Sequence, residues 1–230
     1  MFINKLYKND FFYLFDNRNK MKTLIIDCDG VLYPESQFPL SIVIKAIEKL
    51  AASKSISREE YNKISQETID RGEQGLFNFI LNLCHKNRDL YNSFCKELVD
   101  SLDYSSIKRN DELFNLLIQA SKKYEICIFT NDNNYHLDKV YKQLFGKSLQ
   151  EFPFPSYDIG FTFKDGYFHP KQTKEGYINF MEKINKNKKD CIVIDDSYRN
   201  IKRCIEIGIQ YEFITNENTL SKVLNKLIKS

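Results

Sequence analysis

The feature that most constrains the fold is a repeated alternation of short apolar runs with longer amphipathic segments. Runs such as T-L-I-I-D and C-I-V-I-D-D are β-branched and too short for helices, so they predict buried strands. Strands are expected at residues 23–27, 125–130, 191–196 and 211–215, with a weaker one at 157–163. Helices are expected at residues 110–123, 134–145, 173–186, 198–207 and 218–228. This order predicts an α/β fold with a parallel sheet flanked by helices.

One region breaks the alternation, because its patterns are helical throughout. Four helices are expected between the first two strands, at residues 40–52, 58–70, 73–86 and 88–102. We therefore predict an all-α cap at residues 39–105, inserted into an α/β core formed by residues 21–38 and 106–230. Residues 1–20 are expected to be an N-terminal extension of unknown role, and Met21 is an alternative start of the chain.

Composition narrows the class of protein. The chain of 230 residues is 42% apolar, which is enough for a packed core, and its net charge of +3 is too small and dispersed to indicate a nucleic acid polymer as partner. No apolar run reaches the ~18 residues of a membrane span. Six cysteines without a C-x-x-C pair favour a reducing, cytoplasmic setting. The expected protein is a monomer or homodimer without a membrane partner.

Polar side chains stand where three of the predicted strands end. They are Asp27 and Asp29, then Thr130 and Asn131, then Asp195 and Asp196. In open α/β sheets ligands bind beyond the carboxyl ends of the strands, so we expect these groups to converge. Carboxylates packed together repel one another, and Mg²⁺ relieves that repulsion while binding a substrate phosphate. Acids at the start of a helix can also serve only as N-terminal caps, which is the alternative for Asp195 and Asp196.

The same residues suit phosphoryl transfer. A carboxylate such as Asp27 can attack phosphorus and form an aspartyl phosphate. Thr130 and backbone N–H groups can hold the phosphate oxygens, and a lysine can neutralise the charge. The pattern K-x-T-x-x-G-Y ahead of a helix favours Lys171 over Lys164 and Lys174. Thr130 could instead cap the helix that follows it.

Four motifs in order carry a family resemblance. D-C-D-G-V-L-Y, F-T-N, the downstream Lys171 and V-I-D-D-S together resemble the motifs of the haloacid dehalogenase (HAD) superfamily, and the cap position resembles its helical-cap class. The resemblance implies a Rossmann-like core with Asp27 as nucleophile and metal ligand. Asp29 would act as acid and base and bind Mg²⁺ through its backbone carbonyl. Thr130 and Asn131 would bind phosphate, and Lys171 would form ion pairs with both the phosphate and Asp27.

The resemblance also implies the metal ligands at the fourth motif. Asp196 would bind Mg²⁺ directly, with Asp195 acting partly through a metal-bound water. Dehalogenase members lack the second aspartate of the first motif, so Asp29 favours a phosphatase or phosphomutase.

A narrower resemblance concerns the substrate. D-G-V-L-Y-P, F-T-N-D-N-N-Y-H and D-D-S-Y-R-N-I look like the pyrimidine 5′-nucleotidase branch, which typically reads D-N-T-L-Y-P, F-T-N-A-x-x-x-H and D-D-S-x-R-N-I. Gly30 and Val31 replace the usual Asn-Thr, and Gln172 replaces the proline after the lysine. Weaker candidates for substrate contact are Gln74, Asn78, His85 and His136, of which the histidines have structural roles as alternatives.

The sequence therefore predicts a magnesium-dependent phosphatase of small phosphorylated metabolites, with nucleoside 5′-monophosphates as the expected substrates. The alternatives are a sugar-phosphate phosphatase or phosphomutase of the same superfamily, and a HAD-like protein that binds ligands without turnover. Because the predicted catalytic positions hold competent residues, the enzyme is favoured over the binding protein.

Overall fold

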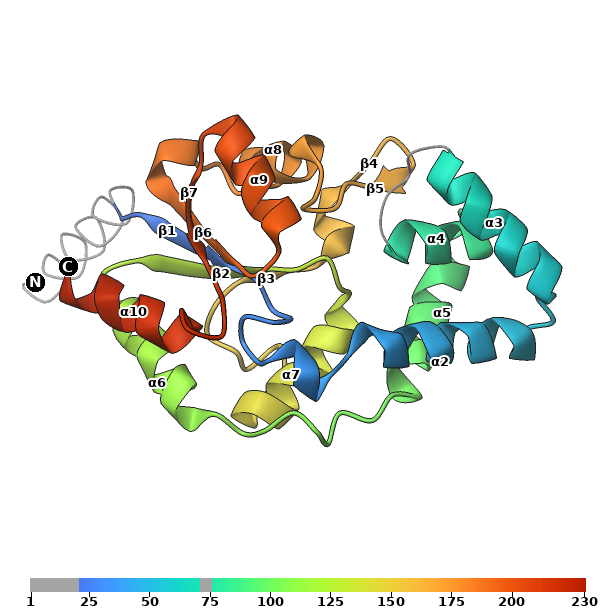
Figure 1. Cartoon of the computed structure of the whole chain (residues 1–230), viewed down its shortest axis with the longest axis horizontal. Coiled ribbons are helices and arrows are strands. Elements are labelled where there is room, and N and C mark those ends of the chain that lie inside the picture. The colour runs from blue at the N-terminus through green and yellow to red at the C-terminus, as the bar shows by residue number, and fades with distance from the viewer. Residues whose placement is uncertain (1–20, 71–75) are drawn as a thin grey trace, which may run out of the picture.

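The computed structural model describes residues 21–70 and 76–230, and its centre is a parallel sheet of five strands (Figure 1). The strand order is β3-β2-β1-β6-β7, so the first strand of the chain lies in the middle. The strands are β1 (Thr23–Ile26), β2 (Glu125–Phe129), β3 (Ser156–Tyr157), β6 (Cys191–Asp195) and β7 (Gln210–Phe213). The predicted α/β fold with a parallel sheet is thus confirmed.

Both faces of the sheet are covered, which explains why its strands are apolar runs rather than alternating ones. Leu24 and Ile26 point to one face and pack with α6 (Asp111–Ala120), α7 (Asn134–Phe145) and α10 (Leu220–Lys229). Ile25 points to the other face and packs with α8 (Lys174–Lys183) and α9 (Tyr198–Ile207). Successive side chains of a strand alternate between faces, so one short strand supplies both cores.

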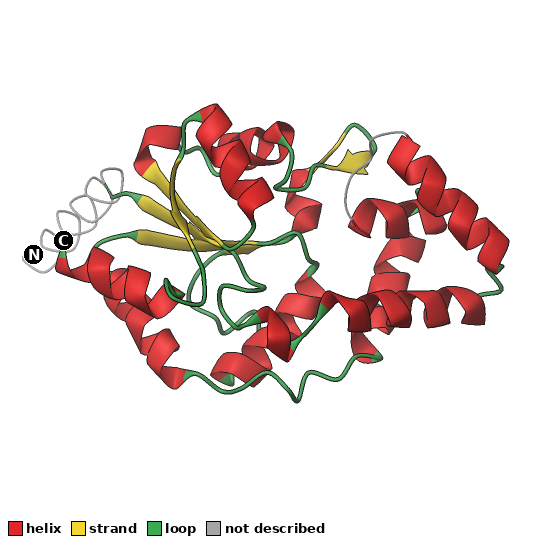
Figure 2. Cartoon of the chain, viewed as in Figure 1, coloured by secondary structure: helices red, strands yellow, loops and turns green. Residues whose placement is uncertain are grey.

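A helical insertion, defined here as α2 to α5, lies between β1 and β2 in the chain and beside the sheet in space (Figure 2). Its helices are α2 (Leu40–Ser53), α3 (Arg58–Asp70), α4 (Leu76–Leu83) and α5 (Arg88–Asp100). They enclose an apolar cluster of their own, which includes Ile47, Ile80, Phe94 and Leu98. The predicted helices of this region are therefore present, apart from the part of 73–86 that lies outside the described residues.

The predicted strand at 157–163 is wrong over most of its length. The chain leaves the sheet after β3, because the Ile159 N–H bonds to the Asp132 carbonyl and a short 3₁₀ helix, η2 (Ile159–Thr162), follows. A hairpin of β4 (Phe163–Lys164) and β5 (Tyr167–Phe168) comes next. Its two-residue turn, Asp165 and Gly166, has positive φ at both positions (54° and 87°), as a tight hairpin turn requires.

This hairpin connects the helical insertion to the core. The Asn78 side chain on α4 accepts a hydrogen bond from the Phe168 N–H (2.8 Å) and donates one to the Phe168 carbonyl (2.9 Å). The Arg88 guanidinium lies over the rings of Phe163 and Phe168, 4.4 and 5.1 Å from their centroids. Because Phe168 is close in sequence to Lys171, these contacts relate the insertion to the loop that carries the predicted lysine.

The cysteines and the length of the helices bear on the expectations drawn from composition. All six cysteines are free and buried, in keeping with the absence of a disulfide pattern. Among the described residues, no helix is long and apolar enough to cross a membrane.

Replacing Asn78 by alanine is expected to destabilise the protein by about 2–3 kcal/mol, because buried backbone groups of Phe168 lose their partner. Urea denaturation followed by circular dichroism measures the change. The matched control is Asn92→Ala at an exposed position of α5, which should change the free energy of unfolding by less than about 0.5 kcal/mol. Equal effects of the two substitutions would contradict the bridging role of Asn78.

Candidate active site

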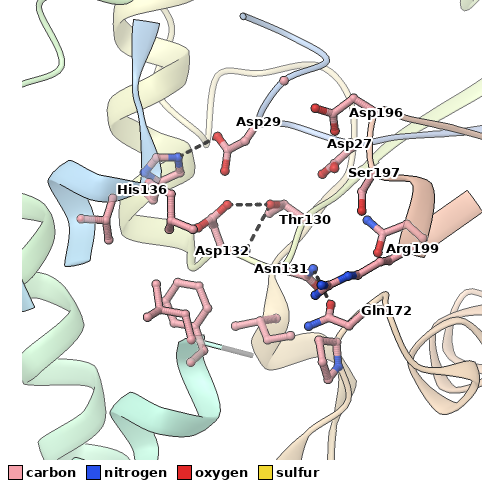
Figure 3. Close-up of a pocket in the computed structure, with 18 of the residues that line it drawn as sticks. Asp27, Asp29, Thr130, Asn131, Asp132, His136, Gln172, Asp196, Ser197 and Arg199 are labelled. Carbon is pink, nitrogen blue, oxygen red and sulfur yellow. Dashed lines mark hydrogen bonds and ion pairs between the residues drawn. The ribbon is translucent and has the colours of Figure 1, made fainter. Parts of the chain in front are cut away.

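The carboxyl ends of β1, β2 and β6 meet at one edge of the sheet and form the floor of a cavity of about 400 Å³ (Figure 3). Asp27, Asp29 and Thr130 line this floor, as does Asp196. The opposite wall is apolar and comes largely from the helical insertion, η2 and β5; its side chains are Phe38, Leu40, Val43, Leu76, Phe77, Ile159 and Phe168. The convergence predicted from the strand ends is therefore present.

A buried lysine between two carboxylates lies beneath the floor. Lys171 is 2% exposed, and its Nζ is 2.5 Å from Asp27 Oδ1 and 3.0 Å from Asp195 Oδ2. Burial opposes the lysine charge, but Asp195 and Asp27 together raise the pKa of Lys171 above its usual value. Burial, followed by repulsion from Asp195, raises the pKa of Asp27 well above its usual value. The site thus holds more negative charge than the single lysine can neutralise.

Asp195 and Asp196 differ sharply in their surroundings. Asp195 is 0% exposed and accepts hydrogen bonds from the Asn200 side chain (3.0 Å) and the Ser197 N–H (2.8 Å), in addition to Lys171. Asp196 is partly exposed, and burial and the Asp195 charge raise its pKa to about 6. Asp27, Asp195 and Asp196 place carboxylate oxygens within 4.8 Å of one another. Such a set of hard oxygen donors fits Mg²⁺. Of the two neighbouring acids, Asp196 is the one whose carboxylate is available to bind it.

Gly30 leaves room for that carboxylate. Its φ is +75°, and a Cβ at this position would lie 1.9 Å from Asp196 Oδ2. Glycine favours this left-handed backbone conformation and lets the Asp196 carboxylate lie at this distance, whereas a Cβ would force that side chain to move. Gly30, noted above as a departure from the resembled branch, lets the Asp196 carboxylate approach the loop after β1.

Asn131 orients the lysine loop with its side chain. Its Oδ1 accepts the Lys171 N–H (2.9 Å), and its Nδ2 donates to Gln172 Oε1 (3.1 Å). The Gln172 carbonyl in turn accepts from Arg203 Nε (3.0 Å). Gln172, where the resembled branch has proline, thus pairs with the Asn131 amide through its side chain. Both residues line the cavity, but the amide of Asn131 is occupied by protein groups.

Asp29 is surrounded by groups that the sequence reading did not connect with it. Tyr33 donates its hydroxyl hydrogen to Asp29 Oδ1, and His136 Nε2 lies 3.2 Å from the same oxygen. Burial opposes ionisation of Asp29, but His136 and the hydrogen bonds around it lower the pKa of this carboxyl well below its usual value. The same contact with Asp29 raises the pKa of His136 to about 9 despite burial.

Asp132 is a further acid of the cavity that the sequence analysis missed. Thr130 donates its hydroxyl hydrogen to Asp132 Oδ2 (3.0 Å). Burial, followed by repulsion from Asp29, raises the pKa of Asp132 well above its usual value. The signal was available, because F-T-N-D carries aspartate where the resembled branch has alanine.

The weaker substrate candidates have different positions. Asn78 lines the cavity, although its amide also binds the Phe168 backbone, and His136 lines it from α7. His85 lies outside this cavity; it borders a separate hollow on the helical insertion, with Glu60 and Lys63. Gln74 lies outside the described residues. Arg199, the arginine of the D-D-S-Y-R-N-I motif, is exposed and lines the cavity.

Comparison with known proteins gives a family. A family model described as haloacid dehalogenase-like hydrolase matches residues 21–208, which is most of the chain. The match spans the strands and loops that carry the site.

Solved structures share the fold at low sequence identity. The chain is similar to HAD family enzyme BT-2542 of Bacteroides thetaiotaomicron, solved with magnesium and inorganic phosphate (18% identity, TM-score 0.52, 85% of this chain and 94% of that one). It is also similar to CbbY of Rhodobacter sphaeroides, solved with xylulose-(1,5)bisphosphate (13%, 0.53, 87% and 90%). A third is YfnB of Bacillus subtilis, bound to magnesium (16%, 0.51, 90% and 99%).

Gly30→Ala is expected to weaken Mg²⁺ binding by about tenfold or more, because the new methyl group displaces the Asp196 carboxylate. Isothermal titration calorimetry with Mg²⁺ measures the change. Gly166→Ala is the matched control: its φ is also positive (+87°), but nothing lies within 4 Å of the added carbon. An unchanged Mg²⁺ affinity in folded Gly30→Ala would refute the proposed role of Asp196.

Proposed function

Because the chain belongs to the haloacid dehalogenase-like hydrolase family, we propose that it is a magnesium-dependent phosphatase acting through a phosphoryl group on Asp27. The observation that carries the proposal is the pairing of Asp27 Oδ1 with buried Lys171 at 2.5 Å, on the floor of a cavity that also holds Asp196. A nucleophilic carboxylate needs this kind of fixed orientation and compensated charge.

The residues present fit a divalent cation. Asp27 and Asp196 would hold Mg²⁺ directly, and the family resemblance adds the backbone carbonyl of Asp29. Asp195 already binds Lys171, Asn200 and a backbone N–H. These bonds favour a role in orienting the site over direct ligation of the metal. When bound, Mg²⁺ would supply the positive charge that lets these carboxylates and a phosphate dianion share one site.

Asp27 and Asp29 divide the chemistry between them. The Cys28 N–H and Lys171 Nζ both contact Asp27 Oδ1, so we assign the attack on phosphorus to Oδ2. As the new O–P bond forms and the ester P–O bond breaks, Asp29 in its protonated form gives its proton to the departing oxygen, which leaves as an alcohol. Asp29 then takes a proton from water while that water attacks phosphorus, which releases phosphate and restores Asp27.

Other groups would hold the phosphate oxygens. The Thr130 N–H bonds to the Tyr157 carbonyl (3.1 Å) and the Cys28 N–H to Asp27, so the N–H groups of Asp29 and Asn131 are our candidates. The Thr130 hydroxyl donates to Asp132. Since the pKa of Asp132 is raised, a protonated Asp132 can donate to the Thr130 oxygen and free that hydrogen for phosphate.

We propose nucleoside 5′-monophosphates as the substrates. The wall opposite Asp27 contains the aromatic side chains of Phe38, Phe77 and Phe168, which can pack against a planar base. The cavity of about 400 Å³ has the size of a small-molecule site. The motifs shared with the pyrimidine 5′-nucleotidase branch support the same substrate class. The helical insertion, residues 39–105 in the sequence analysis, would act as the cap that covers the substrate.

Asp27→Asn is expected to lower phosphate release by more than about 1,000-fold, because the amide cannot form the covalent intermediate. Release of inorganic phosphate from purified protein measures the effect. Asp165→Asn in the β4–β5 turn is a matched control that should retain full activity. Unchanged release in Asp27→Asn would refute the proposed mechanism.

Removal of Mg²⁺ with EDTA is expected to abolish phosphate release, and added Mg²⁺ should restore it. A substrate panel of UMP, CMP, AMP, GMP, sugar phosphates and 4-nitrophenyl phosphate then ranks the leaving groups. We expect the highest kcat/KM for a nucleoside monophosphate. A clear preference for sugar phosphates would contradict the substrate class while leaving the phosphatase mechanism intact.

A further inference from the structure

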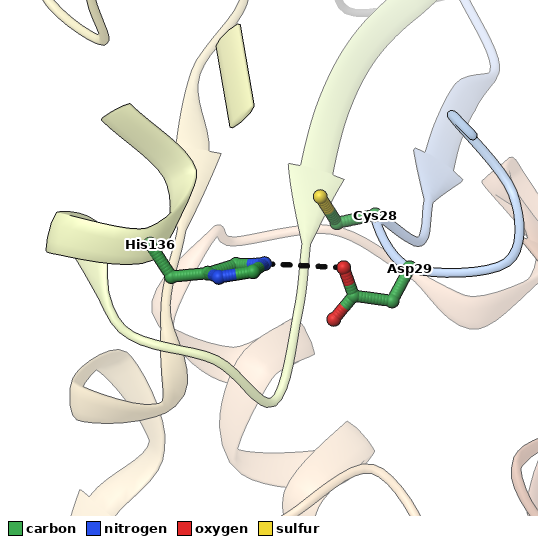
Figure 4. Close-up of side chains that lie close together, drawn as sticks. All are labelled: Cys28, Asp29 and His136. Atoms are coloured by element: carbon green, nitrogen blue, oxygen red, sulfur yellow. Dashed lines mark hydrogen bonds and ion pairs between the residues drawn. The ribbon is translucent and has the colours of Figure 1, made fainter. Parts of the chain in front are cut away.

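His136 faces Asp29 from the first turn of α7, at the junction of the core and the helical insertion. Its side chain is 7% exposed, whereas the Asp29 side chain is 40% exposed, and both line the cavity. His136 Nε2 and the Tyr33 hydroxyl both contact Asp29 Oδ1 (Figure 4 shows the histidine contact). Two hydrogen-bonding groups of the protein therefore lie on Oδ1, and the Asp29 carboxyl also bonds to the Asp132 side chain.

The chemistry of the three groups fixes the direction of these hydrogen bonds. An ionised carboxylate only accepts, so His136 Nε2 carries a hydrogen and donates it. The other ring nitrogen, Nδ1, lies 2.9 Å from the Tyr104 hydroxyl, which can donate to a neutral ring or accept from a charged one. The Nε2–H bond to Asp29 is thus available in both charge states of the ring.

Two donors on Oδ1 have a consequence for the acid form of Asp29. A proton on Oδ1 would face the hydrogens of Nε2 and the Tyr33 hydroxyl, so it belongs on Oδ2. We therefore assign the transfer of that proton to the ester oxygen to Oδ2. The contacts with His136 and Tyr33 therefore decide which carboxyl oxygen takes part in the reaction.

The His136 ring is itself held in place from several sides. The Asn133 side chain caps α7 by accepting the His136 N–H (3.0 Å). Phe38 and Tyr104 stack on each other, with centroids 4.6 Å apart, and lie 5.5 and 5.4 Å from the imidazole centroid. Phe38 precedes α2 and Tyr104 follows α5, so both chain crossings between core and insertion support this ring.

We infer that His136 is a positioning residue that fixes Asp29 for proton transfer to the leaving group, an inference that rests on the proposed function. His136 acts through Asp29 and does not touch the phosphate. It holds Oδ1 so that Oδ2–H points to the ester oxygen as the P–O bond breaks and the alcohol departs.

Other groups near Asp29 complement this role without replacing it. The Cys28 thiol lies close to Asp29 and His136, and burial raises its pKa well above the usual value, so it is a neutral neighbour. Asp132 is the second acid beside Asp29, and the hydrogen bond between the two side chains lowers the pKa of Asp29 and raises that of Asp132. This bond adds to the His136 contact, because Nε2 remains the imidazole donor on Oδ1. Tyr33 supplies the other hydrogen to Oδ1.

The test compares two esters of similar shape and different leaving groups. Departure of 4-nitrophenolate needs little help from an acid, whereas departure of the more basic phenolate needs protonation. We expect His136→Phe, which keeps a ring but loses the Nε2 donor, to lower kcat/KM for phenyl phosphate about tenfold more than for 4-nitrophenyl phosphate. His136→Gln, whose amide can still donate to Oδ1, should recover most of that difference.

A double-variant cycle separates positioning from a merely structural role. In an Asp29→Asn background, adding His136→Phe should cause less than about a twofold further loss of kcat/KM for phenyl phosphate, because the acid that His136 positions is gone. If His136 served only the packing of α7, its substitution would lower kcat/KM for both esters equally and would multiply the loss from Asp29→Asn. Either result would overturn the inference.

The outcomes also distinguish this inference from the proposed function. Wild type that releases no phosphate refutes the function and the inference with it. Wild type that depends on Asp27, with equal losses for the two esters in His136→Phe, refutes the inference alone. Should His136→Phe fail to fold by circular dichroism, His136→Met fills the same space with a flexible side chain that lacks the donor, and the same comparisons apply.

Discussion

The site depends on one interaction, the burial of Lys171 between Asp27 and Asp195. A lysine that is 2% exposed is costly unless carboxylates pair with it, and each of these carboxylates is itself buried beside the other. The three charged groups are therefore mutually required. Because Asp27 and Asp195 end adjacent strands, the order of strands in the sheet determines that they meet. A divalent cation would neutralise the carboxylate charge that remains and so allow a phosphate to bind beside it.

The lysine reaches this position through a loop that the rest of the molecule holds. Asn131 fixes the backbone of Lys171, Gln172 pairs with Asn131, and Asn78 attaches the helical insertion to the hairpin that precedes the loop. On the other side of the cavity, His136 and Tyr33 hold Asp29. Nucleophile and acid are thus fixed by separate sets of contacts, which suits a reaction in which they have different tasks.

Much of this site could be predicted from the sequence, because strand ends are readable from short apolar runs. Asp27, Thr130, Asp195 and Lys171 follow such runs or a recognisable loop pattern, and all of them lie where the sequence analysis expected. The contact of Asn78 with Phe168 was not predictable, because it depends on how the insertion and hairpin fold back. The contact of His136 with Asp29 was not predictable either, because it joins two core segments that are far apart in the sequence. The strand expected at 157–163 failed for a similar reason: the Asp132 carbonyl bonds to the Ile159 N–H and turns the chain away.

The central claim is that Asp27 carries the phosphoryl group during turnover. Acid quenching of the enzyme at steady state with Mg²⁺ and substrate, followed by peptide mass spectrometry, tests it directly. The account predicts an acid-trapped phosphoryl group on the peptide containing Asp27, which disappears after alkaline treatment because acyl phosphates hydrolyse there. Rapid phosphate release with no phosphoryl group on that peptide, under conditions in which chemistry on the enzyme limits the rate, would contradict it.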